Sequence, residues 1–368
     1  MSVYKTVGPT GDFSTINLWV ADVVANHTTA GALTDNVIAG IQAAGIAPSA
    51  DDTVSGWTPS ASNFTTKITA DNTADGGAAG NASFRDNANV RTNALKYNTA
   101  NGAFINYAAS TKTLTVAVDL FTFSDLQAQG NKNYGTTVSL TKTSSTSLSV
   151  IGCIFNSTGG PHDQLLNVDG TGSSYSVYNN LFVGNTTATL CMAWSGANNA
   201  NMKMSYCTFV GASAFAQQVG LGSYGTLVIN NCYIDGAVYG TDIVGNAHGY
   251  TCNTFNCATT NSSLVYSANR SGSDTATQGS AVNSTEFTSS TTDFRLAAGS
   301  VKCKSNGTNV SGITDDISRF TRNASTPCIG AWELASSSVN TNMLPGIAFS
   351  ILPFFMGLLT NLYQLVHK

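Results

Sequence analysis

Charged residues are scarce in this chain, and glutamate and proline are scarcer still. Charged side chains make up 10% of the 368 residues, there are seven prolines, and the only glutamates are Glu286 and Glu333. The 16 lysines and arginines are scattered without runs, so we expect no nucleic-acid partner. Glycine, asparagine, serine and threonine are abundant instead. This balance predicts a chain that is poor in helix and rich in short strands and turns.

One short phrase recurs between residues 147 and 257. Its copies are 149–156 (SVIGCIFN), 176–184 (SVYNNLFVG), 203–211 (KMSYCTFVG), 228–236 (VINNCYIDG) and, more loosely, 250–256 (YTCNTFN). The aligned positions Cys153, Asn180, Cys207 and Cys232 fall 27, 27 and 25 residues apart. A period of this length indicates stacked repeats, and the alternation of apolar residues within each copy is that of strands. We therefore predict an all-β solenoid of roughly twelve coils over residues 5–335.

The shared Cys/Asn position is predicted to form a buried row inside the solenoid. Equivalent residues of successive coils stack, and small or amide side chains suit such a position. The chain has eight cysteines, but 368 residues is too long for a small disulfide scaffold. Cys252 and Cys257 have neither a second such pair nor histidines at ligand spacing, which argues against zinc. We expect no metal and no cofactor.

The two ends of the solenoid need covers, and the sequence offers one at the N-terminus. Residues 4–7 have strand character, 8–11 form a turn, and Ser14 is predicted to cap a helix. We assign residues 1–30 to this cap, 31–335 to the solenoid, 336–342 to a linker and 343–368 to a hydrophobic helix. The buried face of the capping helix is predicted to carry Ile16, Trp19, Val20, Val23 and Val24. Within the less regular residues 50–145, strands are predicted at 64–69 and 114–120.

Two phrases at the ends of the solenoid resemble those of a known family. Residues 7–16 (VGPTGDFSTI) resemble the opening of pectin methylesterases and other right-handed parallel β-helix proteins. Residues 327–333 (PCIGAWE) resemble the phrase that closes many β-helix domains. The resemblance covers about residues 4–335 and implies a single-stranded right-handed parallel β-helix (pectin lyase-like) with a capping helix.

The catalytic residues of the methylesterases are only partly present. By resemblance, Gln218 in 217–221 (QQVGL) and Asp242 in 242–247 (DIVGNA) correspond to the catalytic glutamine and one of two aspartates. The other aspartate is missing, because 237–239 (AVY) stands in its place, and no arginine occurs between residues 145 and 265.

The sequence also lacks the catalytic residues of the lyases and glycosidases that share the β-helix fold. Lyases need a cationic base, and Lys203 is the only lysine or arginine of the repeats; glycosidases need two close carboxylates. A non-enzymatic protein is favoured over an enzyme, which stays open as the alternative, and no catalytic residue is assigned. The candidates for an outer-face site that binds Ca²⁺ or sugar, or for an esterase- or lyase-like activity, are Gln218, Asp235 and Asp242.

The C-terminal segment is strongly apolar. Residues 343–359 contain one serine and no charge, and Pro345 and Pro353 would kink or shorten a helix. Two interpretations compete: a membrane tail anchor, and a helix that packs against sister subunits or another protein. The residues expected to make this attachment are Leu344, Ile347, Phe349, Ile351, Leu352, Phe354, Phe355, Leu358, Leu359, Leu362 and Leu365.

Three functions remain open. The N-terminus leads directly into the cap, so no signal peptide is expected. A β-helix with a hydrophobic assembly tail resembles phage and other viral structural proteins, which implies a virion surface spike, fibre or capsid decoration. Residues 343–368 would then bind other virion proteins or sister subunits, in a homo-oligomer for which a trimer is one candidate. The alternatives are a carbohydrate-binding or carbohydrate-active protein, for example of host glycan, and an extracellular or cell-surface protein anchored in a membrane.

Overall fold

The computed structural model describes most of the chain up to Leu334. The described residues are 2–58, 63–77, 82–85, 93–108, 112–131, 136–141, 147–158, 164–169, 174–185, 190–194, 201–211, 217–218, 226–235, 250–260, 270–271, 274–275 and 279–334. Residues 343–368, with every residue predicted to make the attachment, lie outside them. So do Asp242 and the linker. One compact unit comprises residues 1–333, and residues 334–368 belong to another.

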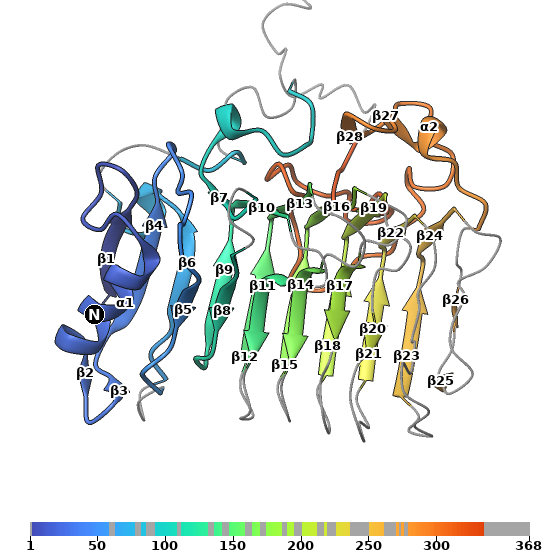
Figure 1. Ribbon diagram of the computed structural model, residues 1–368. Coiled ribbons are helices and arrows are strands. Elements are labelled where there is room, and N and C mark those ends of the chain that lie inside the picture. Colours follow the sequence, from blue (N-terminus) through green and yellow to red (C-terminus); the bar gives the residue numbers. More distant parts are fainter. Residues whose placement is uncertain are drawn as a thin grey trace, which may run out of the picture. The chain divides into compact units, whose positions relative to one another are not determined.

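Three parallel sheets run along the stack of coils (Figure 1). Sheet 1 is formed by β1 (Ser2–Val7), β4 (Asn36–Ile41), β6 (Thr66–Ala70), β9 (Phe121–Ser124), β12 (Ser147–Ile151), β15 (Ser174–Tyr178), β18 (Asn201–Ser205), β21 (Thr226–Asn230), β23 (Tyr250–Phe255) and β25 (Arg270–Ser271), and β26 (Asp274–Thr275) also pairs with β23. Sheet 2 is formed by β7 (Phe104–Asn106), β10 (Gln127–Gly130), β13 (Ile154–Ser157), β16 (Leu181–Val183), β19 (Thr208–Val210), β22 (Tyr233–Ile234) and β24 (Ala258–Thr259). Sheet 3 is formed by β5 (Asp52–Val54), β8 (Leu114–Val116), β11 (Thr136–Thr141), β14 (Gln164–Asp169), β17 (Leu190–Trp194) and β20 (Gln217–Gln218).

The strand pairing confirms the predicted parallel β-helix and its period. Along sheet 1, Ser147 pairs with Ser174, Ser174 with Asn201, and Asn201 with Thr226. These steps reproduce the spacing of 27, 27 and 25 residues read from the repeats. Each coil contributes one strand to each sheet in turn, as β12, β13 and β14 do. The strands predicted at 64–69 and 114–120 are present as β6 and β8.

A left-handed backbone residue turns the chain from sheet 1 toward sheet 2 in the coils that begin with β9, β12, β15, β18, β21 and β23. Its φ lies between 51° and 62° in six successive coils, at Asp125, Gly152, Asn179, Tyr206, Asn231 and Asn256. Glycine, asparagine and aspartate adopt this conformation at low cost, which explains five of the six residues. We call these residues the corner row. Several of their side chains bind the C-terminal part of the compact unit, as described below.

The residue after each corner points into the core and forms the predicted buried row. The Asn180 side chain accepts a hydrogen bond from the Cys153 amide at 2.8 Å and donates one to the Val150 carbonyl at 2.9 Å. The Cys207 amide lies 3.4 Å from the sulfur of Cys232. The row continues to Cys257, which directly follows the fifth and loosest copy of the phrase. Cys153, Cys207 and Cys232 are buried as predicted, and Cys257, Cys303 and Cys328 are buried as well; none of these six forms a disulfide.

Aromatic rings stack beside this row. The ring centroids of Phe155 and Phe182 are 4.9 Å apart, and those of Phe182 and Phe209 are 4.7 Å apart, with interplanar angles of 6° and 4°. All three rings are buried. Because parallel coils repeat at about 4.8 Å, identical rings in register are forced into this stacked geometry.

The N-terminal cap differs from its prediction by one residue. The cap of helix α1 (Ile16–Asn26) is Thr15 and not Ser14, because Thr15 has the extended backbone and its hydroxyl accepts from the Leu18 amide at 3.2 Å. Among the five residues predicted for the inner face, Ile16, Trp19 and Val23 are buried, Val20 is half-buried and Val24 is exposed. A short hairpin, β2 (Thr28–Thr29) with β3 (Ala32–Leu33), follows the helix. Two single-turn 3₁₀ helices, Thr73–Asp75 and Thr99–Asn101, lie between β6 and β7.

The parallel strands end earlier than predicted. Among the described residues the last one is β26, whereas coils were expected to about residue 335. The chain then forms helix α2 (Asn283–Glu286) and the antiparallel hairpin β27 (Phe287–Ser289) with β28 (Asp293–Leu296). Residues 279–334 pass along the outer side of sheet 2 (Figure 1). The physical reason is that this outer side carries large apolar side chains: Ile154, Leu181 and Tyr233 are buried but do not belong to the inner core.

Residues 303–333, here called the strap, bind the corner row. The Asn231 side chain donates to the Thr308 carbonyl at 2.7 Å and accepts from the Thr308 amide at 3.0 Å. The Tyr206 hydroxyl donates to the same carbonyl, also at 2.7 Å. The Asn179 side chain donates to the Asp315 carbonyl at 2.8 Å. The phrase at 327–333 thus belongs to the strap and not to a last coil.

A buried carboxylate lies at the N-terminal end of sheet 3. Asp52 is 1% exposed, and it accepts a hydrogen bond from the buried Tyr107 hydroxyl at 3.0 Å. Burial raises the pKa of Asp52 to about 6, because it penalises the ionised form more than the hydrogen bonds favour it.

Acid is therefore expected to stabilise this end of the solenoid. A pKa raised on folding means that the contribution of Asp52 to stability is fully present below about pH 4 and is lost as the pH rises through about 6. At pH 8 we expect Asp52→Asn to raise the free energy of unfolding by about 2–3 kcal/mol, because the amide keeps the acceptor for Tyr107 without the charge. Denaturant unfolding at pH 4 and pH 8 measures this. The exposed neighbour provides the control: Asp51→Asn removes only the weaker repulsion between Asp51 and Asp52, so it should gain much less stability at pH 8, and an equal gain would refute the assignment.

Candidate functional site

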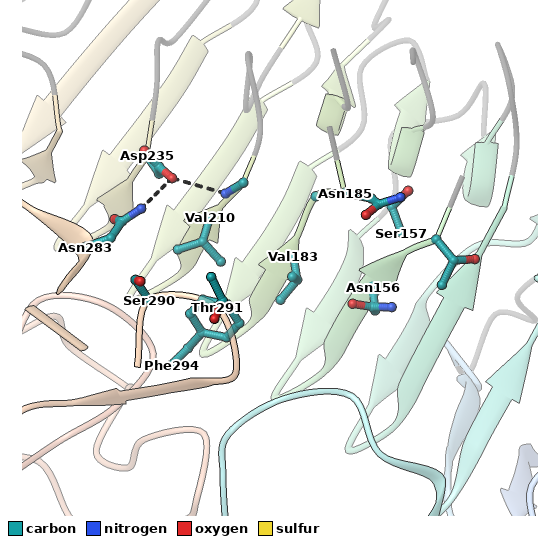
Figure 2. A pocket seen from close by; sticks show the side chains of 13 residues that line it. Asn156, Ser157, Val183, Asn185, Val210, Asp235, Asn283, Ser290, Thr291 and Phe294 are labelled. Atoms are coloured by element: carbon teal, nitrogen blue, oxygen red, sulfur yellow. Dashed lines mark hydrogen bonds between the residues drawn. The ribbon is translucent and has the colours of Figure 1, made fainter. Parts of the chain in front are cut away.

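An open groove of about 500 Å³ lies where the strands of sheet 2 end. One side is formed by the ends of β13, β16, β19 and β22, and the other by α2 and the β27–β28 hairpin (Figure 2). Its lining residues are Asn156, Ser157, Thr158, Val183, Gly184, Asn185, Val210, Gly211, Asp235, Asn283, Ser290, Thr291 and Phe294. Consecutive coils and the returning chain therefore create the groove together.

The middle of the groove is apolar. Val183 and Val210 occupy paired positions of β16 and β19, and Phe294 lies opposite them on β28 (Figure 2). The backbone is closely packed beneath, because a Cβ on Gly211, whose φ is 68°, would lie 2.5 Å from the Gly184 carbonyl oxygen. A side chain at this position would have to move the turn of the neighbouring coil.

Asp235 stands at one end of the groove and holds its two sides together. One carboxylate oxygen accepts from the Asn283 side chain at 2.7 Å and from the Gly211 amide at 3.2 Å (Figure 2). The other accepts from the Thr260 hydroxyl at 3.1 Å. A carboxylate held by three donors serves as a structural acceptor.

Asn283 is fixed from a second direction. The Tyr233 hydroxyl donates a short hydrogen bond to the side-chain oxygen of Asn283. Burial raises the pKa of Tyr233 above its usual value, so the hydroxyl keeps its proton and remains the donor. The Asp235 end of the groove is consequently preorganised.

The structure does not bring the candidate residues together on one sheet. Asp235 follows β22 of sheet 2, whereas Gln218 ends β20 of sheet 3, where it pairs with Trp194. Asp242 lies outside the described residues, so its role stays a prediction. Lys203 is exposed between the buried Met202 and Met204 and therefore points away from the core.

The lining of the groove lacks the side chains that glycosidases and polysaccharide lyases use. Of its thirteen residues none is lysine, arginine or histidine, and Asp235 is the single carboxylate. Glycoside hydrolysis uses two carboxylates, and lyase chemistry uses a cationic base. Within the described residues, no group of three or more metal-binding side chains is assembled either. What the lining offers is amide and hydroxyl groups beside an apolar floor.

Most groove residues were not anticipated from the sequence. Asn156 stands where the next coil has Val183, and a polar residue directly after the apolar pair Ile154 and Phe155 was the available signal. The opposite side could not be foreseen, because it requires the chain to return along sheet 2 after residue 279.

Comparisons with known proteins add little to this geometry. No protein-family model matches the chain, and no curated protein matches it. Among solved structures, pectate lyase Pel9A aligns over 91% of this chain and 97% of its own, with 11% identity and a TM-score of 0.36. The pectin methylesterase from Aspergillus niger in deglycosylated form aligns over 85% and 92%, with 12% identity and a TM-score of 0.32. Values this low carry no argument about activity, and the parallel β-helix rests on the strand pairing itself.

Proposed function

We propose that the protein is a non-enzymatic structural component, which presents a stable β-helix on a larger assembly and is attached to it through residues 343–368. The assembly we favour is a virion surface, where the protein would be a spike, fibre or capsid decoration. The observation that carries the proposal is the abrupt change at residue 333. A compact unit ends there, and the sequence that follows has no charge until Lys368.

The last residue of that unit is firmly held. The Glu333 carboxylate accepts from the Cys328 amide at 2.8 Å and from the Arg322 guanidinium at 3.3 Å, and the Glu333 amide donates to Asp316 at 2.8 Å. The proposed attachment segment thus follows, after the linker 336–342, a unit whose last residue is held by three hydrogen bonds. Among the described residues no helix is long and apolar enough to cross a membrane. The proposed attachment through residues 343–368 rests on their sequence.

Removal of residues 336–368 tests the attachment. We expect the truncated chain to keep its circular dichroism and melting temperature, because the compact unit is intact, and to lose self-association and partner binding. Sedimentation of both chains, with and without liposomes, measures the change. A full-length Phe355→Asp variant is the matched control and should lose the same associations. A full-length chain that is monomeric and does not bind liposomes would contradict the proposal.

The same measurement separates the alternatives. Partition of the full-length chain into liposomes without self-association would favour a membrane-anchored cell-surface protein. The second candidate function, carbohydrate binding, is supported by the groove and its lining of amide and hydroxyl groups beside the single carboxylate Asp235. It is compatible with a structural role and is independent of the tail.

A further inference from the structure

We propose that the groove beside Asp235 binds a short stretch of a neutral, hydroxyl-rich polysaccharide. This inference deepens the second candidate function, on which it rests, and does not depend on the C-terminal segment. Its starting point is the chemistry of the lining. Polar groups lie at both ends, with Asn156, Ser157 and Asn185 toward one and Asp235 with Asn283 at the other. The apolar Val183 and Val210 lie between them.

This alternation suits a sugar better than other small molecules. A pyranose ring has an apolar C–H face, which buries well on valine, and a rim of hydroxyls that donate to and accept from amides. Acidic polysaccharides fit poorly. No lysine, arginine or histidine lines the groove to compensate their carboxylates, and Asp235 would repel them.

The spacing of the coils favours an extended chain as the ligand. Asn156 pairs with Val183 and Val183 with Val210, so the groove crosses consecutive coils at about 4.8 Å each. That step is comparable to the length of one sugar ring. Adjacent sugars of a polymer would then meet equivalent positions on adjacent coils.

The groove is also rigid before any ligand arrives. Its coil side consists of paired strand ends, and the Asp235–Asn283 hydrogen bond of 2.7 Å ties the opposite side to them. A preformed site loses little conformational entropy on binding.

Titration of the full-length protein with neutral hexasaccharides tests the inference. The neutral probes are hexasaccharides of glucose, mannose, galactose and N-acetylglucosamine, and polygalacturonate is the acidic counterpart. Binding is measured by calorimetry. We expect at least one neutral probe to bind and polygalacturonate not to bind. Asn156→Ala should raise Kd roughly three- to tenfold through the loss of a hydrogen bond, and Val183→Arg should raise it more than about tenfold by filling the floor.

The matched control comes from the same row of sheet 2. Gln129 pairs with Asn156 one coil away and does not line the groove, so Gln129→Ala should leave Kd unchanged. Melting temperatures of the three variants establish that they fold. The inference is overturned if no neutral probe binds with a Kd below about 5 mM. It is also overturned if polygalacturonate binds equally well or if Gln129→Ala weakens binding as much as Asn156→Ala. Each of these results leaves the outcome of the tail deletion unaffected.

Discussion

Replacement of Arg322 by alanine is expected to lower the free energy of unfolding by about 3–5 kcal/mol, because it leaves buried partners without their donor. The guanidinium is buried at the centre of the strap. It donates to the Asn179 side chain at 2.9 Å, to the Asp315 carbonyl at 2.9 Å and to the Gly330 carbonyl at 3.1 Å. It also covers the Tyr206 ring at 3.8 Å from the centroid.

Loss of this side chain should release the strap as a unit. Hydrogen exchange would then show residues 303–333 opening before the coils, and denaturant unfolding gives the magnitude. Arg322→Lys keeps the charge but not the planar fork, so it should recover only a small part of the loss. Arg319→Ala is the control, since its side chain is 39% exposed and its contact with Asp125 is 3.4 Å long; we expect less than about 1 kcal/mol. Equal losses at both positions would show that the strap is not held through Arg322.

Phe182→Ala should lower the free energy of unfolding by a comparable amount, because it leaves a cavity in the core. The ring lies between those of Phe155 and Phe209, and its removal leaves a cavity that neighbouring coils cannot close without breaking strand register. Large-to-small changes of this kind cost about 3–5 kcal/mol. Denaturant unfolding of Phe182→Ala beside Phe182→Leu measures the effect. Leucine refills most of the volume, so Phe182→Leu should lower the free energy of unfolding clearly less than Phe182→Ala. A decrease below about 1 kcal/mol for Phe182→Ala would mean that the stack is not tightly packed.

The regular part of the fold was predictable because every coil gives its residues the same environment. Cys153, Asn180, Cys207 and Cys232 repeat in sequence as they stack in space, so their spacing predicted the strand register. The cap was misplaced by one residue, from Thr15 to Ser14, because two adjacent hydroxyl residues suit an N-cap equally and the backbone angles decide between them.

The strap and the groove could not be predicted in the same way. Their contacts join single residues far apart in the chain: Arg322 meets Asn179 across 143 positions, and Arg85 meets Asp315 across 230. No repeat or alternation marks such pairs. Asp235 was recognised as a polar residue of the outer face, but its tie to Asn283 depends on where the returning hairpin lies.

The binding of the strap to the corner row has a consequence for how this protein can change in length. In most solenoids a coil touches only its neighbours, and whole repeats are gained or lost with little penalty. Here one segment contacts corners from Asn179 to Asn256, and Arg85 adds the corner at Asp125 through Asp315. Deleting a single coil would move each later corner one step away from its strap partner. The length of the strap therefore fixes the number of coils between the corners that it contacts, so this part of the chain cannot gain or lose a coil without losing strap contacts.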